Sequence, residues 1–225
     1  MESPTLMERR RQGALEEIVD VALDLFVRNG FEATTVESIA AAAGCSPRTF
    51  YRYFGSKEDV MFHDLPDTIA GMGRVLDGHL ADGLPAWDAV STSLLEFIAR
   101  FDTGQALTAT RRMDLWSHEP ALRARYLQHI ALAEDTVLRS LCRHRGTRPE
   151  DDHLAQLIAV AAVGAYRITV ATHGRATPGG ANRADVNGAG ANPAGANRGD
   201  RKLTDRLRES LAVLATGLHP GRGDR

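Results

Sequence analysis

The sequence predicts an all-α protein built from a short N-terminal three-helix domain and a larger helical domain. Apolar residues recur at spacings of three and four along most of the chain, and the alternation typical of strands is nearly absent. Helix caps and glycine stops also follow one another closely within the first 60 residues. With 225 residues, 43% of them hydrophobic, the chain is long enough to bury one good core or two small ones.

The first helix is predicted over residues 6–29, and Gly30 provides the left-handed residue at which such a helix ends. One face of this helix is apolar, while the opposite face carries mostly acidic side chains. The apolar face consists of Leu15, Ile18, Val19, Ala22, Leu25 and Phe26.

Two short helices follow the first one. Thr34 or Thr35 can cap the first of them, and Gly44 stops it. Ser46 and Pro47 begin the second, because serine accepts a hydrogen bond from an orphan backbone N–H and proline suits the first helical position.

The second short helix ends near Tyr53 or Phe54. Ser56, with Asp59 three residues later, forms a capping-box-like start for a fourth helix that runs towards about Gly78. Further helices are predicted near 85–103, 105–117, 120–145, 151–173 and 202–217.

The chain is predicted to divide into an N-terminal domain of residues 1–60 and a C-terminal domain of residues 61–225. Within the second domain, residues from about 174 to 200 form an imperfect Gly-, Ala- and Asn-rich repeat with one large apolar residue, Val186. Such a segment cannot bury enough apolar surface to offset the entropy lost on ordering, so we expect a disordered loop.

Positive charge is concentrated in one part of the N-terminal domain. The chain has a formal net charge of −2, which excludes a uniformly basic surface for nucleic acid. Residues 44–57 nevertheless carry three basic side chains and no acidic one, and residues 9–11 form a second basic cluster. For residues 9–11, contact with DNA phosphates or the minor groove and a solvated helix end both stay open.

The second and third helices and the glycine-containing turn between them match the helix-turn-helix motif, whose second helix enters the major groove of DNA. Lys57 lies in the first turn of the fourth helix, where backbone N–H groups also favour a phosphate. Hydroxyl groups on or beside the third helix can donate to phosphate oxygens, namely those of Ser46, Thr49, Tyr51 and Tyr53. The sequence therefore predicts an interface with double-stranded DNA.

The run TTVESIAAAAGCSPRTFYRYFGSKEDV, with ALDLFVRNGFEATT before it, resembles the DNA-binding domain of the TetR family of transcriptional regulators over residues 12–62. Cys45 stands where the family usually carries valine, which is a small apolar exchange. The resemblance implies an all-helical homodimer on a palindromic operator, with a C-terminal domain that binds a small effector. We therefore expect a repressor that a small hydrophobic effector releases from DNA.

The resemblance also assigns roles to individual residues. Thr35, Tyr51, Tyr53 and Lys57 would contact phosphate. Arg48 and Thr49 would face base edges, and an arginine there most often reads guanine through two hydrogen bonds.

Residues 85–173 resemble, more loosely, the effector domains of TetR-family members that respond to acyl-CoA-like ligands, mainly over RRMDLWSHEPALRARYLQHIALAEDTVLRSL and LAQLIAVAAVGAY. Arg111 and Arg112 could meet the phosphates of a CoA head group. An apolar channel could be lined by Trp87, Phe97, Phe101, Met113, Trp116 and Tyr126. The alternative for each of these residues is ordinary core or ordinary surface.

Two C-terminal helices are predicted to form the homodimer interface, which the resemblance places across a two-fold axis. The helix at 151–173 is apolar over a wide arc, and the helix at 202–217 carries leucines at helical spacing. The residues concerned are Ala159, Ala162, Val163, Ala165 and Tyr166 on one helix and Leu203, Leu207, Leu211 and Leu214 on the other. A self-contained monomer core is the alternative.

Two other classes of function compete with a regulator. One is an enzyme, and the other is a ligand-binding protein that no longer uses its DNA-binding domain. Asp114 stands four residues before His118, a spacing that could build a general base or half a metal site. The second half also carries His129, His144, His153 and His173. No catalytic, phosphate-binding or metal-binding motif accompanies them, so we expect no enzyme, no metal site and no cofactor.

The cysteines and the lengths of the apolar runs predict the cellular compartment of the protein. Cys45 and Cys142 cannot form a disulfide framework, and no run approaches the ~20 apolar residues of a membrane span. The basic N-terminal residues lack the apolar stretch of a secretory signal. The sequence thus predicts a cytoplasmic protein that does not contact membranes.

Overall fold

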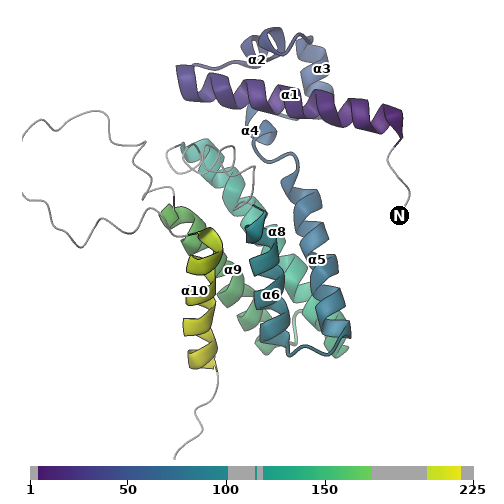
Figure 1. The fold of residues 1–225 in the computed structure, drawn as a ribbon, viewed down its shortest axis with the longest axis vertical. Helices are drawn as coiled ribbons and strands as arrows, with labels where there is room; N and C mark the ends of the chain where they lie inside the picture. The colour runs from purple at the N-terminus through teal and green to yellow at the C-terminus, as the bar shows by residue number, and fades with distance from the viewer. Residues whose placement is uncertain (1–4, 101–114, 116–118, 174–201, 219–225) are drawn as a thin grey trace, which may run out of the picture. The chain divides into compact units, whose positions relative to one another are not determined.

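The computed structural model describes residues 5–100, 115, 119–173 and 202–218, and every regular element within these ranges is an α-helix (Figure 1). The prediction of an all-α protein is confirmed. The predicted helix at 105–117 and the predicted loop at 174–200 fall outside the described residues, apart from Leu115, which is helical.

The chain forms two compact units: residues 1–65 with 115–127, and residues 66–114 with 128–225. Helix α8 (Pro120–Arg145) supplies residues to both: its first residues, up to Leu127, belong to the first unit, and the rest belong to the second.

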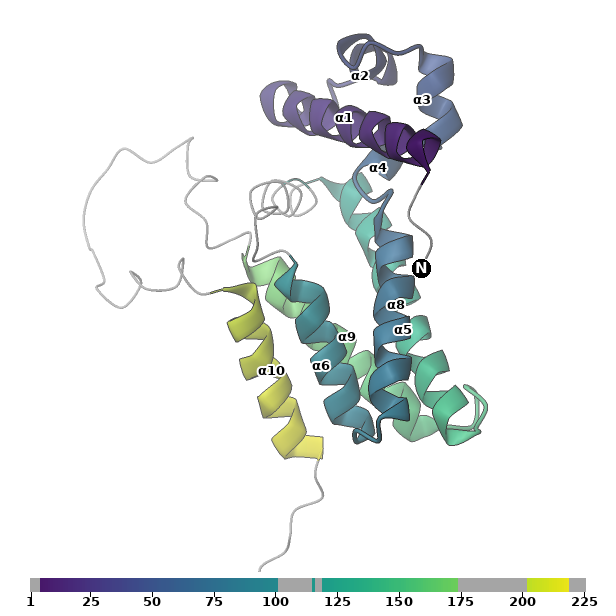
Figure 2. The same ribbon diagram turned by 45° about the vertical axis from the view of Figure 1, so that its right-hand side comes forward.

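In the first unit, α1 (Leu6–Asn29) packs against α2 (Val36–Ala42), and α2 packs against α3 (Pro47–Tyr53). Both ribbon views show α2 and α3 on the same side of α1 (Figures 1 and 2). The predicted first three helices are confirmed. Their shared core includes Ile18, Ala22, Phe26, Phe31, Ile39, Ala40, Phe50 and Phe54.

The predicted fourth helix is wrong in its extent, because the structure has two helices there, α4 (Lys57–Val60) and α5 (Leu65–Ala81). Pro66 explains the break. Proline has no N–H to donate to the carbonyl oxygen of Phe62, and its ring would collide with that carbonyl in a continuous helix. The N–H of Leu65 instead donates to the Phe62 oxygen at 3.1 Å, three residues back, in a turn.

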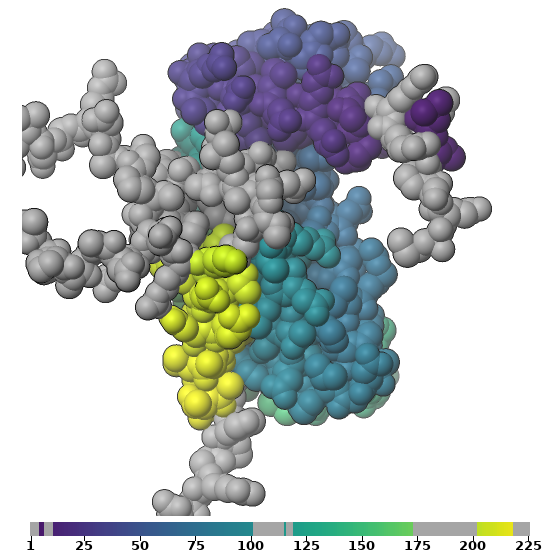
Figure 3. All heavy atoms as spheres, viewed as in Figure 1, coloured from purple at the N-terminus to yellow at the C-terminus, as the bar shows by residue number. Residues whose placement is uncertain are grey.

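The second unit packs α6 (Ala86–Ala99), α9 (His153–His173) and α10 (Leu203–Leu218) against one another. Figure 3 shows α10, in yellow, lying beside α6. The ring of Phe97 meets that of Tyr166 edge to face, with 5.6 Å between centroids. Burial raises the pKa of the Tyr166 phenol far above its ordinary value, so this group stays neutral.

Most apolar residues predicted for the dimer interface are buried inside this unit instead. On α10 the buried leucines are Leu203, Leu207 and Leu211, while Leu214 is half-buried. On α9 all five predicted residues are buried, namely Ala159, Ala162, Val163, Ala165 and Tyr166. The wide apolar arc of α9 therefore has two parts, an inner one that forms the core and an outer one that reaches the surface.

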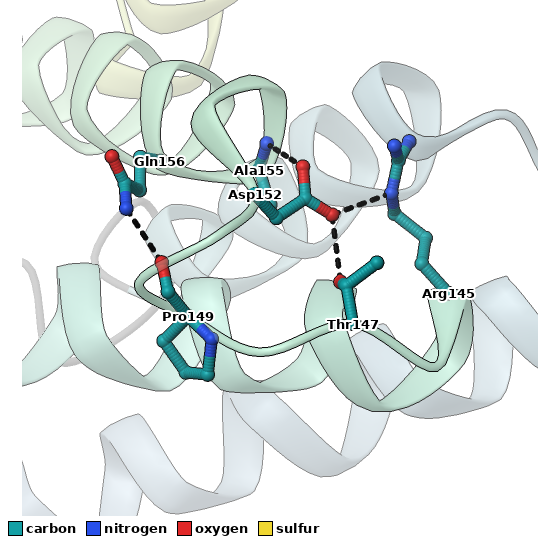
Figure 4. A network of polar contacts seen from close by, with 6 residues as sticks. All are labelled: Arg145, Thr147, Pro149, Asp152, Ala155 and Gln156. Atoms are coloured by element: carbon teal, nitrogen blue, oxygen red, sulfur yellow. Dashed lines mark hydrogen bonds and ion pairs between the residues drawn. The ribbon is translucent and has the colours of Figure 1, made fainter.

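The turn from α8 to α9 is held by one carboxylate, Asp152, which is buried. Its Oδ1 accepts the N–H of Ala155 at 3.0 Å, and its Oδ2 accepts from Thr147 Oγ1 at 2.7 Å and Arg145 Nε at 2.8 Å (Figure 4). Gly146 makes the turn possible with a φ of 67°. The Ala155 and Thr147 hydrogen bonds, with Arg145, lower the pKa of Asp152.

Among the described helices, α9 is long and apolar enough to cross a membrane by length and composition, with a mean hydropathy of 1.6 over residues 153–172. Half of this apolar segment is buried inside the protein. A buried core helix meets the same criterion.

Candidate nucleic-acid interface

Two local structural features determine where α2 ends and α3 begins. Gly44 has a φ of 65°, and the next N–H, that of Cys45, donates to the carbonyl oxygen of Ala40 at 2.8 Å. Ser46 then caps α3, because its Oγ accepts the N–H of Thr49 at 3.1 Å. Both features were predicted from sequence and are confirmed. The Oγ atoms of Ser46 and Thr49 also lie 3.0 Å apart, so these hydroxyls are already paired.

The side chains of α3 divide between an anchored face and an exposed face. Phe50 and Phe54 are buried, and their ring centroids lie 5.1 Å apart. Arg48 and Arg52 are exposed, and Tyr51 has 54% of its surface exposed. The aromatic core thus fixes the helix while its polar side chains stay accessible to a partner.

Of the two threonines before α2, Thr35 is the cap. Its Oγ1 accepts the N–H of Ser38 at 3.1 Å, and the Ser38 Oγ accepts the N–H of Thr35 at the same distance. Thr34 is buried, and its Oγ1 donates to the carbonyl oxygen of Gly30 at 2.8 Å. Thr35 is exposed at the start of α2, as a phosphate contact requires.

Lys57 is engaged inside the unit. Its Nζ donates to the carbonyl oxygens of Phe31 at 2.8 Å and Thr34 at 3.1 Å, and lies 4.2 Å from the centroid of the Phe31 ring. Two of the three N–H donors of the ammonium group are used there. Lys57 therefore fastens α4 to the turn between α1 and α2, and its contact with phosphate stays a prediction.

Tyr53 is half-buried beside Arg52 and Arg11, which the sequence placed in its two basic clusters without assigning them a definite contact. Arg52 Nη2 donates to the Tyr53 hydroxyl oxygen at 3.0 Å, and its guanidinium carbon lies 4.7 Å from the ring centroid. The guanidinium carbon of Arg11 lies 5.9 Å from the same centroid. The two basic clusters of the sequence indicated that these arginines could bind an anion. Only the fold shows that one arginine from each cluster lies beside the same ring. The side chains of Arg9 and Arg10 lie outside the described part.

The predicted effector residues are only partly described. Trp87 is half-buried and Phe97 is buried, ten positions apart on α6 and so about 15 Å apart along its axis. Tyr126 is buried on the part of α8 that belongs to the first unit. Phe101, Arg111, Arg112, Met113 and Trp116 lie outside the described residues. A channel lined by these side chains stays a prediction.

No group of three His, Cys, Asp or Glu side chains that could hold a metal ion occurs in the ranges that the structure describes. Asp114, His118 and the side chain of His173 fall outside those ranges.

Comparison with known proteins identifies both parts of the chain. Residues 18–63 match the family described as "Bacterial regulatory proteins, tetR family", and residues 84–182 match "MftR C-terminal domain". MftR of Mycobacterium tuberculosis, a regulator named for mycofactocin biosynthesis, is 30% identical over 143 residues, which are 64% of this chain and 71% of that protein. The chain belongs to the TetR family of transcriptional regulators.

Other TetR-type proteins support the same assignment. The regulator TcmR of Streptomyces glaucescens is 29% identical over 160 residues, 69% of this chain and 70% of its own. FadR of Thermus thermophilus, solved with lauroyl-CoA, shares the fold with a TM-score of 0.55 and 22% identity over 93% of this chain and all of that one. FadR of Bacillus subtilis, solved with stearoyl-CoA, gives 0.54 and 17%, over 91% and 99%. This TetR-family regulator therefore carries its helix-turn-helix in α2 and α3.

Proposed function

We propose that this TetR-family regulator is a homodimeric repressor that leaves its operator when a small hydrophobic effector binds. The observation that carries the proposal is the exposed polar face of α3, with Arg48 and Tyr51 accessible on a helix anchored by Phe50 and Phe54. In this function Arg48 and Thr49 read base edges. The phosphate contacts come from Thr35, Ser46, Tyr51, Tyr53 and Lys57.

The outer part of α9 supports a homodimer. Four large apolar side chains on this one helix are between 50% and 60% exposed, namely Leu154, Leu157, Val160 and Ile168. Exposed apolar surface of this kind marks an interaction site in soluble proteins. Val213 of α10, 71% exposed, adds to it. A second copy related by a two-fold axis would cover this surface and present two α3 helices to half-sites about 34–36 Å apart.

The effector we propose is an acyl-CoA. Support comes from the FadR proteins of similar fold, which were solved with lauroyl-CoA and stearoyl-CoA. The predicted ligand residues of the domain at 61–225 suit a long apolar chain with a phosphorylated head group. Binding to an operator and to such a ligand favours a cytoplasmic location.

The direct test is equilibrium binding of the full chain to a labelled duplex from the promoter beside its own coding sequence, with a random duplex as control. We expect tighter binding to the promoter at two salt concentrations and weaker binding at the higher one. Adding lauroyl-CoA should release the promoter duplex, while free CoA should not. Equal binding to both duplexes would contradict operator recognition, and no release by any acyl-CoA would contradict the effector class alone.

A further inference from the structure

A cluster of two guanidinium groups on one aromatic ring lies beside the recognition helix. It consists of Arg11 on α1 and Arg52 and Tyr53 on α3, and we call it the Arg11–Tyr53–Arg52 cluster. Both ribbon views place α3 against the N-terminal half of α1, which brings Arg11 to this ring (Figures 1 and 2). Neither basic cluster of the sequence forms this arrangement alone.

The ring holds both arginines in place. The guanidinium carbons of Arg52 and Arg11 lie 4.7 and 5.9 Å from the Tyr53 centroid, within the range of a cation–π interaction. Arg52 is fixed further by its hydrogen bond to the Tyr53 hydroxyl oxygen. Two side chains that are normally free to sample many rotamers are thus already ordered, which lowers the entropy that a ligand must remove.

The positive charge of the cluster is not neutralised within the described structure. Among the side chains that are described, no carboxylate forms an ion pair with Arg11, Arg48 or Arg52. Arg28, at the other end of α1, is by contrast paired with Asp24 at 3.8 Å. Two ordered, uncompensated guanidinium groups provide planar donors that match the oxygens of a phosphate.

We propose that the Arg11–Tyr53–Arg52 cluster binds one stretch of the DNA phosphate backbone and extends the interface from α3 to the start of α1. This rests on the proposed function, because a duplex must lie along α3. The DNA backbone, rather than a free anion, is the source of the phosphate because the cluster adjoins Arg48 and Tyr51 on the exposed face of α3. Besides its own hydroxyl contact, Tyr53 positions the two arginines through its ring. Lys57 is already bonded to Phe31 and Thr34.

The test is the salt dependence of binding to a random duplex, which reports the number of phosphates neutralised. Each contact contributes about 0.9 to the slope of log K against log salt concentration. Because the dimer contains two copies of each arginine, we expect Arg11→Gln and Arg52→Gln each to reduce the slope by about 1.8 and the double variant by about 3.6. Arg52→Lys should restore the slope, and Arg28→Gln, on the same helix, is the matched control with an unchanged slope.

Tyr53→Phe removes the hydroxyl group and keeps the ring, so it distinguishes the contribution of one from that of the other. It keeps the aromatic face and both positive charges, so the slope should be that of the unchanged protein, while affinity for every duplex falls because the neutral hydroxyl contact with phosphate is lost. If the slopes for Arg11→Gln and Arg52→Gln equal that for Arg28→Gln, the proposal that the cluster binds the phosphate backbone is wrong. If inorganic phosphate raises the thermal midpoint of the unchanged protein but not of these variants, while their slopes stay unchanged, the site binds a free anion and the DNA assignment is wrong. If the unchanged protein binds no duplex at low salt, the proposed function fails instead.

Discussion

Arg125 on α8 forms an ion pair with Asp59 on α4, 66 positions earlier in the chain. Both residues belong to the first unit, so the start of α8 is tied to the helix that follows α3. The rest of α8 belongs to the second unit. This pair therefore joins α4, which follows the helix-turn-helix, to a helix whose later residues belong to the second unit.

The ion pair should contribute measurably to stability. We expect Asp59→Asn and Arg125→Gln to show a coupling free energy of about 1 kcal/mol in a double-mutant cycle, because both groups are partly shielded from water. Urea unfolding of the four proteins measures it. The pair Asp205 and Arg208, which is more exposed, serves as the reference and should couple more weakly. A coupling no larger than this reference would exclude a structural role for the pair.

Lys57→Met should lower the free energy of unfolding by about 1–2 kcal/mol, because the carbonyl oxygens of Phe31 and Thr34 lose a charged donor. The turn that carries Thr35 should then be less well fixed. Binding to promoter and random duplexes should weaken by the same factor. Denaturant unfolding and fluorescence anisotropy measure the two effects, and Lys202→Met, at an exposed lysine, is the control. Unchanged stability would show that the two hydrogen bonds add nothing.

Arg48→Ala should relax sequence preference, whereas Tyr51→Phe should weaken binding to every duplex alike. A bidentate arginine–guanine pair contributes about 1–3 kcal/mol of discrimination, and a phosphate contact contributes none. Competition between promoter and random duplexes measures the ratio of affinities. An equal loss on both duplexes for Arg48→Ala would place this side chain on the phosphate backbone.

Leu157→Glu should convert a dimer to a monomer. The side chain is 60% exposed on the outer face of α9, and an isologous interface would contain two copies of the buried charge. At about 2 kcal/mol for each copy, the dissociation constant should rise about 1000-fold. Analytical ultracentrifugation reports the change. Val27→Glu, at a valine that is 56% exposed on α1, should leave the dimer intact.

Asp152→Asn should lower the thermal midpoint at neutral pH, and this difference should shrink in acid. The folded-state pKa of Asp152 is lowered by the Ala155 N–H, then by Thr147 and Arg145. Its contribution to stability is therefore fully present above the unfolded value of about 3.9, and it is lost as pH falls through the lower folded value. Thermal unfolding between neutral pH and pH 3 or so tests this. The exposed neighbour Asp151, changed to asparagine, should behave like the unchanged protein at each pH.

The helix-turn-helix was predictable because its limits depend on neighbouring residues. Ser46 caps α3 through a hydrogen bond to Thr49, and Gly44 supplies a positive φ at the end of α2. Pro66 is an equally local signal for the break between α4 and α5. The capping pattern at Ser56 predicts where a helix begins but not where it ends, so the predicted helix ran past this proline. When both partners of a hydrogen bond lie within about four positions of each other, the sequence alone is enough to predict it.

The spacing of apolar residues determined by itself that this protein is all-helical, and the caps and stops within the first 60 residues predicted a helix-turn-helix. The resemblance of residues 12–62 to the TetR family pointed to the family that the comparisons show. Only the tertiary structure decided that Lys57 bonds to carbonyl groups 26 and 23 positions earlier, that Arg11 meets Tyr53, and which face of α9 is buried. Helical periodicity identifies an apolar face but not the helix that covers it. That choice depends on the packing of segments distant in sequence, which no local pattern encodes.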